Sequence, residues 1–378
     1  MSKTNATGEP QPISHGLRRF LYATAGLTGA AILIVEILGA KMLSPFVGTS
    51  HFVWTAQIAV TLVSLAVGYY FGGKLVDRSP RLERLFFCIA LAAAYLCFGI
   101  LIIEKVAYLF LNLNLALGAL LSSAVLFFVP LTLLAAVGPF LIKVLALSFQ
   151  GIGGQVGRLN AISTLGSVLG TILIGYLLLP FLPNSVTMYL TAAILFLDAA
   201  IYFLLWHRKS LVPLALIAAI AFVLGALGIR SDLVSRWAYV EELYRGNSNF
   251  GMLQVIQSKD QRKRYYMNDY LVQNTYDPQL KKSTSLFTYM LRYLAEGYTT
   301  NCHDVLCIGL GVGIVPRDLA HEGKRVDVVE INPKVVELGQ KYFDLDPTLM
   351  DITIGDGRYF VNRTTNRYDA IVLDAFLG

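Results

Sequence analysis

The stretch VLCIGLGVG, from Val305 to Gly313, decides the fold of the C-terminal part of this chain. Its first four residues are apolar and predict a short buried strand, and its alternating glycines predict a tight turn. Residues 314–322 then carry apolar side chains at helical spacing, and residues 325–331 form a second apolar run that contains Glu330. A strand, a glycine turn, a helix, a second strand and an acid in this order are typical of a nucleotide-binding βαβ unit.

Each part of this unit has a physical role in holding a nucleoside. Gly309, Gly311 and Gly313 let the backbone come close to a ligand, and the helix that follows offers free N–H groups at its start. Glu330 lies about 20 residues past the first glycine, where an acid accepts hydrogen bonds from both ribose hydroxyls. The alternative interpretation is a tight turn in an ordinary α/β protein. The strand, the helix and the acid in register favour a nucleoside-type ligand.

The composition indicates a membrane protein. Of the 378 residues, 55% are hydrophobic and only 15% are charged, and the mean hydropathy is +0.58. Soluble α/β domains are not that apolar, so much of the chain is expected to lie in lipid. The net charge of +6 fits basic loops at a membrane and does not indicate a nucleic-acid partner. The four cysteines form no paired motif, so we expect neither a disulfide nor a metal site.

Seven apolar runs approach or exceed the roughly 20 residues that cross a bilayer. Glycines at helix-packing spacing within two of these runs predict close contacts between helices. The polar N-terminus does not resemble a cleavable signal peptide. The runs are 20–43, 52–76, 85–103, 117–137, 161–182, 186–206 and 211–229, and the glycines are Gly68, Gly72, Gly73, Gly166, Gly170 and Gly175.

The chain is therefore expected to have four parts. Residues 1–18 form a cytoplasmic tail, and residues 19–229 form a transmembrane domain of about seven helices. Residues 230–300 form a β-rich subdomain, in which 252–257, 264–267 and 271–273 read as a β-meander and 283–296 as an amphipathic helix. Residues 301–378 form a partial nucleoside-binding domain. This last part continues with a helix at 334–342, a strand at 352–354, a turn at 355–357 and a strand at 370–373.

Two expectations concern the limits of the soluble part. Four parallel strands leave an unpaired sheet edge, so we expect about a hundred residues of the domain to be missing and the turnover of this chain to be weak. Basic residues follow the second, fourth and sixth runs and occur in the N-terminal tail, which predicts a cytoplasmic N-terminus.

Seven crossings from a cytoplasmic start place the soluble domain outside, where nucleotide cosubstrates are scarce. Three solutions stay open: residues 211–229 do not cross, residues 106–115 add a crossing, or the domain does not use a cytosolic cosubstrate. Because ligand chemistry constrains sidedness more than a count of spans does, we expect a multi-pass protein of the inner (plasma) membrane with a cytoplasmic soluble domain.

Glu36 is the polar residue of the membrane half that stands out, because it lies in the apolar run ILIVEIL at 32–38. A carboxylate in lipid is costly and usually faces a bundle interior or a cavity. A proton or cation site and a structural hydrogen bond to a neighbouring helix are the two interpretations. Asp198 is a candidate companion. The segment 72–78 resembles a loop of major-facilitator transporters.

Several motifs of the soluble half resemble spermidine synthases, which are polyamine aminopropyltransferases built on a methyltransferase-like fold. The resemblance extends from about residue 244 to the end of the chain. The membrane half is similar to the multi-span segment fused ahead of such domains in bacterial proteins. The soluble motifs are NFG at 249–251, Gln273 with Asp277, the glycine turn, VEINP at 329–333, GDG at 355–357 and YD with DAF at 368–376, and the membrane motifs are EILGA at 36–40, GYYFGG at 68–73 and STLGSVLGT at 163–171.

This resemblance implies a fold and a set of roles. The fold is a multi-span α-helical membrane domain, then a small β-meander and a partial Rossmann-like, methyltransferase-type α/β domain. Glu330 would hold the ribose of decarboxylated S-adenosylmethionine, and Asp356 with Gly357 would hold its adenine. The three glycines would line the thioether end of that ligand. Gln273 would face an amine substrate such as putrescine, and Asp374 would be the catalytic carboxylate. No metal is implied.

The sequence departs from the family at the reacting end of the pocket. Val312 stands where spermidine synthases have the aspartate that binds the aminopropyl amine, and Leu377 stands where they have a second loop aspartate. The helix that normally carries Tyr, a polar partner and Glu offers 287–289, FTY. Losing the partner of a buried ammonium costs several kcal/mol. Adenosyl recognition is therefore expected to be retained, and recognition of the diamine and the aminopropyl group to be weakened.

Three hypotheses follow. The first is a membrane-tethered aminopropyltransferase. The second is a methyltransferase that uses intact S-adenosylmethionine, which Val312 favours because a methyl donor has no bare aminopropyl amine. The third is a transport or sensor protein that binds a polyamine or nucleoside without turnover, which Glu36 favours. The partners expected in the first case are a small-molecule amine and the lipid bilayer, and a homo-oligomer is compatible with these features.

Overall fold

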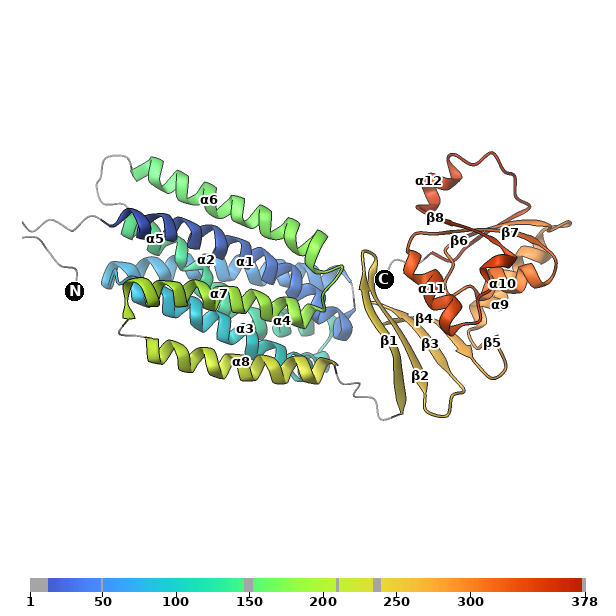
Figure 1. Ribbon diagram of the computed structural model, residues 1–378, viewed down its shortest axis with the longest axis horizontal. Coiled ribbons are helices and arrows are strands. Elements are labelled where there is room, and N and C mark those ends of the chain that lie inside the picture. The colour runs from blue at the N-terminus through green and yellow to red at the C-terminus, as the bar shows by residue number, and fades with distance from the viewer. Residues whose placement is uncertain (1–12, 49, 146–151, 209–210, 234–238, 376–378) are drawn as a thin grey trace, which may run out of the picture. The chain divides into compact units, whose positions relative to one another are not determined.

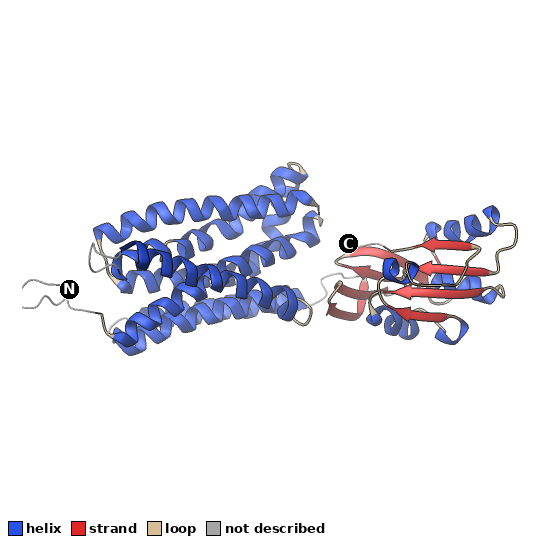
Figure 2. Ribbon diagram, turned by 90° about the horizontal axis from the view of Figure 1, so that it is seen from above, coloured by secondary structure: helices blue, strands red, loops and turns tan. Residues whose placement is uncertain are grey.

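The computed structural model describes residues 13–48, 50–145, 152–208, 211–233 and 239–375 (Figure 1). The chain divides into two compact units, Met1–Val234 and Ser235–Gly378. The first is helical and the second contains both sheets of the described chain (Figure 2). Each unit has its own apolar core.

Long helices that run side by side build the first unit (Figures 1 and 2). Seven helical segments of the described chain are long and apolar enough to cross a membrane, judged by length and composition. The sequence predicted seven. The elements are α1 (His15–Val47), α2 (His51–Arg78), α3 (Leu82–Leu111), α4 (Leu115–Ala135), α5 (Val137–Leu145), α6 (Ile152–Ile172) with a π-helical turn at Leu173–Leu178, α7 (Asn184–Trp206) and α8 (Leu211–Leu233).

One of the expected solutions for sidedness does not fit this arrangement. Residues 106–111 continue α3 to its end at Leu111, and α4 begins at Leu115. The stretch 106–115 is therefore not a separate crossing. Its apolar residues extend a helix that already has enough length to span a bilayer.

Small residues let α1 and α6 approach each other closely. A Cβ atom on Gly166 would lie 2.0 Å from the carbonyl oxygen of Gly26, and one on Gly170 would lie 2.8 Å from Ala30. The hydroxyl of Ser167 donates to the Gly29 carbonyl at 3.0 Å. Of the other predicted packing glycines, Gly68 and Gly72 contact α4 and the residue that follows it, whereas Gly73 and Gly175 have nothing within 4 Å of a Cβ.

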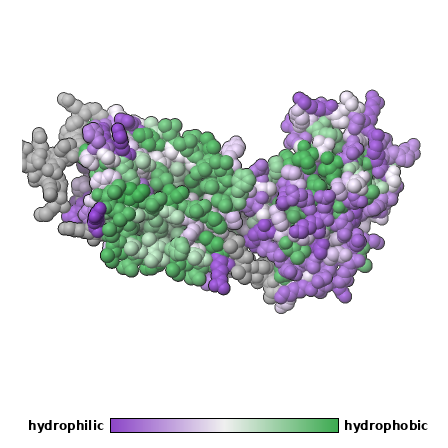
Figure 3. All heavy atoms as spheres, viewed as in Figure 1, coloured by the Kyte–Doolittle hydropathy of each residue, from purple (hydrophilic) through white to green (hydrophobic). Residues whose placement is uncertain are grey.

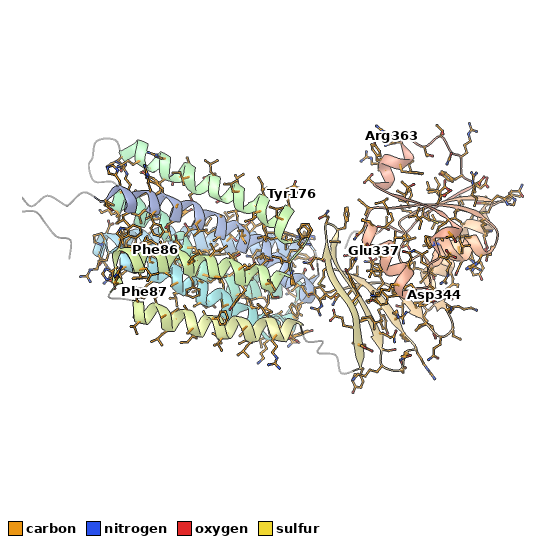
Figure 4. The ribbon with its side chains drawn as sticks, in the orientation of Figure 1. Phe86, Phe87, Tyr176, Glu337, Asp344 and Arg363 are labelled. Atoms are coloured by element: carbon orange, nitrogen blue, oxygen red, sulfur yellow. The ribbon has the colours of Figure 1, made fainter. Side chains whose placement is uncertain are left out.

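The outer surface of the helical unit is apolar over most of the face shown in Figure 3. Figure 4 shows the same division at single residues, with Phe86 inside the helical unit and Tyr176 on its outer side. Phe86 is fully buried, whereas Tyr176 is 77% exposed. Large exposed apolar side chains on several helices are what a lipid-facing surface would require.

The second unit contains two sheets. A five-stranded antiparallel sheet runs in chain order, and a four-stranded parallel sheet has the order β8-β7-β6-β9. The strands are β1 (Val240–Ser248), β2 (Gly251–Ser258), β3 (Arg264–Asn268), β4 (Leu271–Asp277), β5 (Lys282–Ser283), β6 (Asp304–Ile308), β7 (Arg325–Glu330), β8 (Asp351–Ile354) and β9 (Ala370–Leu373), and the helices are α9 (Leu286–Tyr298), α10 (Ile314–His321), α11 (Pro333–Tyr342) and α12 (Gly357–Val361), with a 3-10 turn at Pro347–Leu349.

The predicted strands and helices of this unit are present, whereas β1, β5, α12 and the 3-10 turn were not predicted. Strand β1 has the sequence VEELYRGNS, in which apolar and polar residues do not alternate, yet it pairs with β2 along its length. The predicted turn at 355–357 leads at once into α12, which Asp356 caps. The unit is a sheet-containing α/β region consistent with a methyltransferase-like domain.

The strand order positions a ligand site. Strand β6 lies between β7 and β9. After β6 the chain continues to β7 on one side of it and later returns to β9 on the other side, so the strand order reverses at the carboxyl end of β6. In open α/β sheets, ligands bind outside the carboxyl ends of the strands at this reversal point. The carboxyl ends here are Ile308, Glu330 and Leu373.

Candidate nucleoside and amine site

A cavity of about 270 Å³ lies at the carboxyl ends of β6, β7 and β9 and also touches the antiparallel sheet. Seven of the residues predicted for a site in this unit line it together. They are Gln273, Gly309, Gly311, Glu330, Asp356, Gly357 and Asp374. The sequence placed these residues up to a hundred positions apart, and the fold brings them around one space.

Positive φ angles shape the glycine turn, with +90° at Gly309, +59° at Gly311 and +85° at Gly313. A Cβ on Gly309 would lie 2.2 Å from the carbonyl oxygen of Asp374, so only glycine lets the end of β9 pass this close. Gly313 differs from the other two because it precedes α10 and packs on Leu345, and it does not line the cavity. Its predicted place beside a ligand stays a prediction, because in this structure the residue packs on the core side of the turn.

Glu330 is held rigidly at the end of β7. Its side chain is 7% exposed. One carboxylate oxygen accepts the backbone N–H of Leu310 at 2.9 Å, and the other accepts that of Asn332 at 2.8 Å. Burial raises the pKa of Glu330, while these N–H groups act in the opposite direction. Each oxygen keeps a further lone pair, so the carboxylate can accept two hydroxyl groups from a ribose.

Asp356 and Gly357 lie at the other side of the cavity. Asp356 is exposed and caps α12 by accepting the backbone N–H of Tyr359 at 2.8 Å. A Cβ on Gly357 would lie 2.5 Å from the Ile308 side chain, so glycine allows the start of α12 to approach the end of β6. Arg358 follows on the same wall. This side of the cavity therefore offers a carboxylate oxygen as a hydrogen-bond acceptor, and the absence of a side chain at Gly357 leaves space for a planar base.

Asp374 stands at the end of β9, where its backbone N–H donates to the Ile308 carbonyl at 2.9 Å. Burial raises the pKa of this carboxyl from 3.8 to about 6, and the nearby Glu330 carboxylate adds to the increase. A carboxyl group with such a pKa changes its protonation state close to physiological pH, which suits proton transfer.

Several lining residues were missed by sequence reasoning. Tyr266, Asn268 and Asn274 lie on strands of the antiparallel sheet and Phe250 lies in the turn between β1 and β2; of this sheet, the sequence assigned only Gln273 to a site. Asn332 links this sheet to the parallel one, because its Nδ2 donates to the Ser248 hydroxyl at 3.0 Å. The NFG motif gave a signal for Phe250, whereas nothing in the local pattern marked Asn268 or Asn274.

The departures from the spermidine synthase pattern lie in different places. Val312 is fully buried in the core and does not line the cavity. Tyr289 on α9 donates to the Ser283 carbonyl at 2.8 Å and is likewise absent from the lining. Leu377 falls outside the described residues. The structure therefore directs the Val312 side chain away from the ligand space, where it neither helps nor blocks an aminopropyl amine.

Glu36 belongs to the helical unit and not to this cavity. Its carboxyl group interacts with Thr61 on α2. One turn earlier, Gln57 is fully buried, accepts the Ser123 hydroxyl at 2.5 Å and leaves its Nε2 without a hydrogen bond in the described chain. Among the described residues, no three His, Cys, Asp or Glu side chains lie close enough together to hold a metal ion.

The C-terminal unit is similar to proteins of known family. The spermine/spermidine synthase domain matches residues 285–376. A polyamine aminopropyltransferase of Clostridium botulinum is 30% identical over 141 residues, covering 35% of this chain and 48% of the relative. The corresponding protein of Vibrio vulnificus is 39% identical over 109 residues, covering 27% of this chain and 36% of the relative. An N-terminal histidine N-methyltransferase of Emericella nidulans is 41% identical over 80 residues, covering 20% of this chain and 14% of the relative.

These matches cover only part of each relative. They span at most about half the length of those relatives, and the family match begins at α9 and covers the glycine turn, Glu330, Asp356 and Asp374. The matched relatives named polyamine aminopropyltransferases are transferases. Over residues 285–376, the C-terminal unit of this chain is therefore similar to the spermidine synthase-like family.

Proposed function

We propose that this protein is a membrane-bound aminopropyltransferase that moves an aminopropyl group from decarboxylated S-adenosylmethionine to an amine such as putrescine. The observation that carries the proposal is one cavity lined by both the Glu330 carboxylate, whose geometry suits a ribose, and the partly buried Asp374 carboxyl. The similarity to polyamine aminopropyltransferases supports the same reaction.

The proposed binding mode follows from the cavity walls. Glu330, fixed by two backbone N–H groups, would accept both ribose hydroxyls. Asp356, at the exposed side, would accept the adenine amino group, and Gly357 leaves room for the base. Gly309 and Gly311 would lie under the sulfonium end of the donor. Gln273 lines the same cavity and would face the amine substrate.

The proposed chemistry is a displacement at carbon. The lone pair of the acceptor nitrogen forms a bond to the carbon beside the sulfonium, the carbon–sulfur bond breaks, and methylthioadenosine leaves with that electron pair. The new nitrogen centre loses a proton. Asp374, deprotonated above about pH 6, is placed to take it and to hold the ammonium beforehand. The water-poor wall of the cavity strengthens this attraction.

Calorimetric binding tests this assignment on the full chain in detergent. We expect decarboxylated S-adenosylmethionine and methylthioadenosine to bind, and Glu330→Gln to weaken both by about tenfold to a hundredfold, because hydrogen bonds to a charged group contribute about 1.5–3 kcal/mol. Product analysis with putrescine then tests transfer. Glu337→Gln on the exposed face of α11 is the matched control, since it removes the same charge outside the cavity. Equal affinities for wild type and Glu330→Gln would contradict the proposed ribose contact.

The membrane location is part of the proposal. We infer that the helical unit spans the inner (plasma) membrane several times and that the second unit faces the cytoplasm, where the donor is made. Seven apolar helices and their exposed apolar side chains support the insertion. A cytoplasmic N-terminus and a cytoplasmic C-terminal unit require an even number of crossings, so one of the seven helices would not cross.

A methyltransferase is the second candidate, because one similar protein is an N-terminal histidine N-methyltransferase. Intact S-adenosylmethionine as donor and a methylated product would identify it. A polyamine or nucleoside sensor or transporter is the third. The Glu36–Thr61 interaction favours it, as does the nearby Gln57 Nε2, which has no hydrogen-bond partner among the described residues. Polyamine flux in proteoliposomes that Glu36→Gln abolishes, without product formation, would support this third function.

A further inference from the structure

An irregularity in β4 places two consecutive amides in the cavity. In a regular strand, neighbouring side chains point to opposite faces of the sheet. Here Tyr266 pairs with Asn274 while Met267 pairs with Val272, so Gln273 is an extra residue without a partner on β3. Such a bulge re-aims side chains and is common beside active sites. As a result, both Gln273 and Asn274 line the cavity.

Asn274 lies directly beside the reacting end of the site. Its side chain is 3% exposed. A Cβ on Gly311 would lie 3.0 Å from the Asn274 Nδ2 atom and 3.1 Å from the Asp374 Oδ2 atom. An amide and a carboxylate therefore border the same point above Gly311. A methyl group on residue 311 would make both side chains shift by a few tenths of an ångström, and the φ of +59° separately disfavours other residues.

The polar groups at this point are a mixed set. Asp374 is an acceptor that suits an ammonium, while Asn274 Nδ2 and Gln273 Nε2 are donors. The Gln273 Nε2 atom is buried and has no partner within the described chain. A buried donor without a partner is costly unless a ligand supplies an acceptor. This set of groups fits a cosubstrate whose chain ends in an ammonium alone. It also fits a cosubstrate whose chain ends in an ammonium with a carboxylate beside it.

We propose that Asn274 determines the donor specificity of the site. As a neutral amide beside Asp374, it lets the subsite accept both decarboxylated and intact S-adenosylmethionine. Asp374 holds the ammonium of either donor, and the Asn274 and Gln273 amides hold the carboxylate that only the intact donor carries. This inference rests on the proposed function for the identity of the nucleoside ligand, and it concerns binding, not transfer.

Two variants separate this role from a structural one. Asn274→Asp keeps the size of the side chain and adds a carboxylate that repels the carboxylate of the intact donor. Asn274→Ala removes the amide donor without adding charge. Methylthioadenosine is the internal control ligand, because it lacks the amine end and does not reach this subsite. Asn301→Asp is the matched control variant, since Asn301 is exposed and precedes β6, at the opposite end of the strands from the cavity.

Calorimetric titration of all three ligands into the detergent-purified full chain tests the proposal. We expect the wild type to bind the two donors with affinities within about tenfold of each other. Both Asn274 variants should weaken the intact donor by about tenfold or more relative to the decarboxylated donor, while methylthioadenosine changes by less than about threefold. Asn301→Asp should match the wild type.

The opposite outcomes are distinct. If either folded Asn274 variant weakens all three ligands equally, or if the wild type rejects the intact donor by more than about a hundredfold, Asn274 does not set specificity. If the binding pattern holds but no aminopropyl group reaches an amine, the proposed function fails and the specificity role stands. If none of the three ligands binds the wild type, both are overturned.

Discussion

At the scale of single residues, the partly buried Asp374 carboxyl connects the stability of the fold to its proposed activity. Its pKa of about 6 lies above the ordinary value of 3.8, mainly because the charged form is desolvated. Above pH 6 the folded protein therefore holds a charge that is costly to bury. Below about pH 4 the group is protonated in both the folded and the unfolded state, and this cost is absent.

Asp374→Asn should therefore stabilise the fold and reduce activity. We expect a higher melting temperature than the wild type at pH 8, with a difference that shrinks as the pH falls through 6 toward 4. Differential scanning calorimetry from pH 4 to pH 8 measures this. Asp356→Asn, at the exposed helix cap, is the comparison variant, because its carboxyl is not buried. A constant difference at all pH values would contradict a buried charge at Asp374.

The same carboxyl predicts the pH profile of transfer. Because only the deprotonated form accepts a proton, kcat should fall as the pH decreases through about 6, with about a tenfold loss for each further unit. Asp374→Asn should lower kcat by about a hundredfold to ten-thousandfold and remove this acid limb. Steady-state rates from pH 5 to pH 9 with saturating donor test it. An unchanged acid limb in the variant would assign the limb to another group.

Gly309 offers a clean test of the close approach between β6 and β9. Gly309 and Gly323 have similar φ angles, +90° and +83°. A Cβ on Gly309 would clash with the Asp374 carbonyl, whereas a Cβ on Gly323 would have no atom within 4 Å. Gly323→Ala should cost about 1–2 kcal/mol of unfolding free energy, the ordinary backbone penalty. Gly309→Ala should cost more and also abolish donor binding. Denaturant unfolding and calorimetry compare the two, and equal losses would show that the contact is unimportant.

At the scale of elements, the α1–α6 contact depends on the absence of side chains at Gly166 and Gly170. Gly166→Ala should separate the helices, because a Cβ would lie 2.0 Å from a backbone oxygen, and should lower the melting temperature in detergent by several degrees. Gly157→Ala, in the same helix with nothing within 4 Å, should leave it unchanged or raise it slightly, since alanine favours helix. If both variants changed the melting temperature by a similar amount, the α1–α6 contact would not contribute to the stability of the helical unit.

Elements were the part of the structure that the sequence predicted best. Apolar runs of 19 to 25 residues gave the helices, because length and hydropathy alone decide whether a helix can cross lipid. Strands β6 and β7 followed from short apolar runs on either side of the glycine turn. Strand β1 escaped prediction, because its stability comes from pairing with β2 and not from its own pattern.

At the scale of the whole molecule, the proposed sidedness is directly testable. Ser79 lies between α2 and α3, and Gln261 lies in the exposed turn between β2 and β3. We expect single cysteines at both positions, in a background without the four native cysteines, to escape a membrane-impermeant maleimide in intact spheroplasts. Both should react after permeabilisation. Labelling of Gln261→Cys in intact spheroplasts would show that the second unit lies outside the membrane. A donor made in the cytoplasm could then not reach the cavity, and the proposed reaction would be contradicted.

The sequence by itself predicted the apolar helical half, the βαβ unit with Glu330 and the resemblance of the C-terminal unit to spermidine synthases, because hydropathy, periodicity and short motifs are local properties of the chain. It also named most residues that line the cavity. Only the tertiary structure decided that Val312 and Gly313 turn into the core and that Asn274 joins Asp374 above Gly311. Those outcomes depend on a β-bulge and on the contact between two sheets. Such contacts arise from residues far apart in the chain, and no local pattern encodes them.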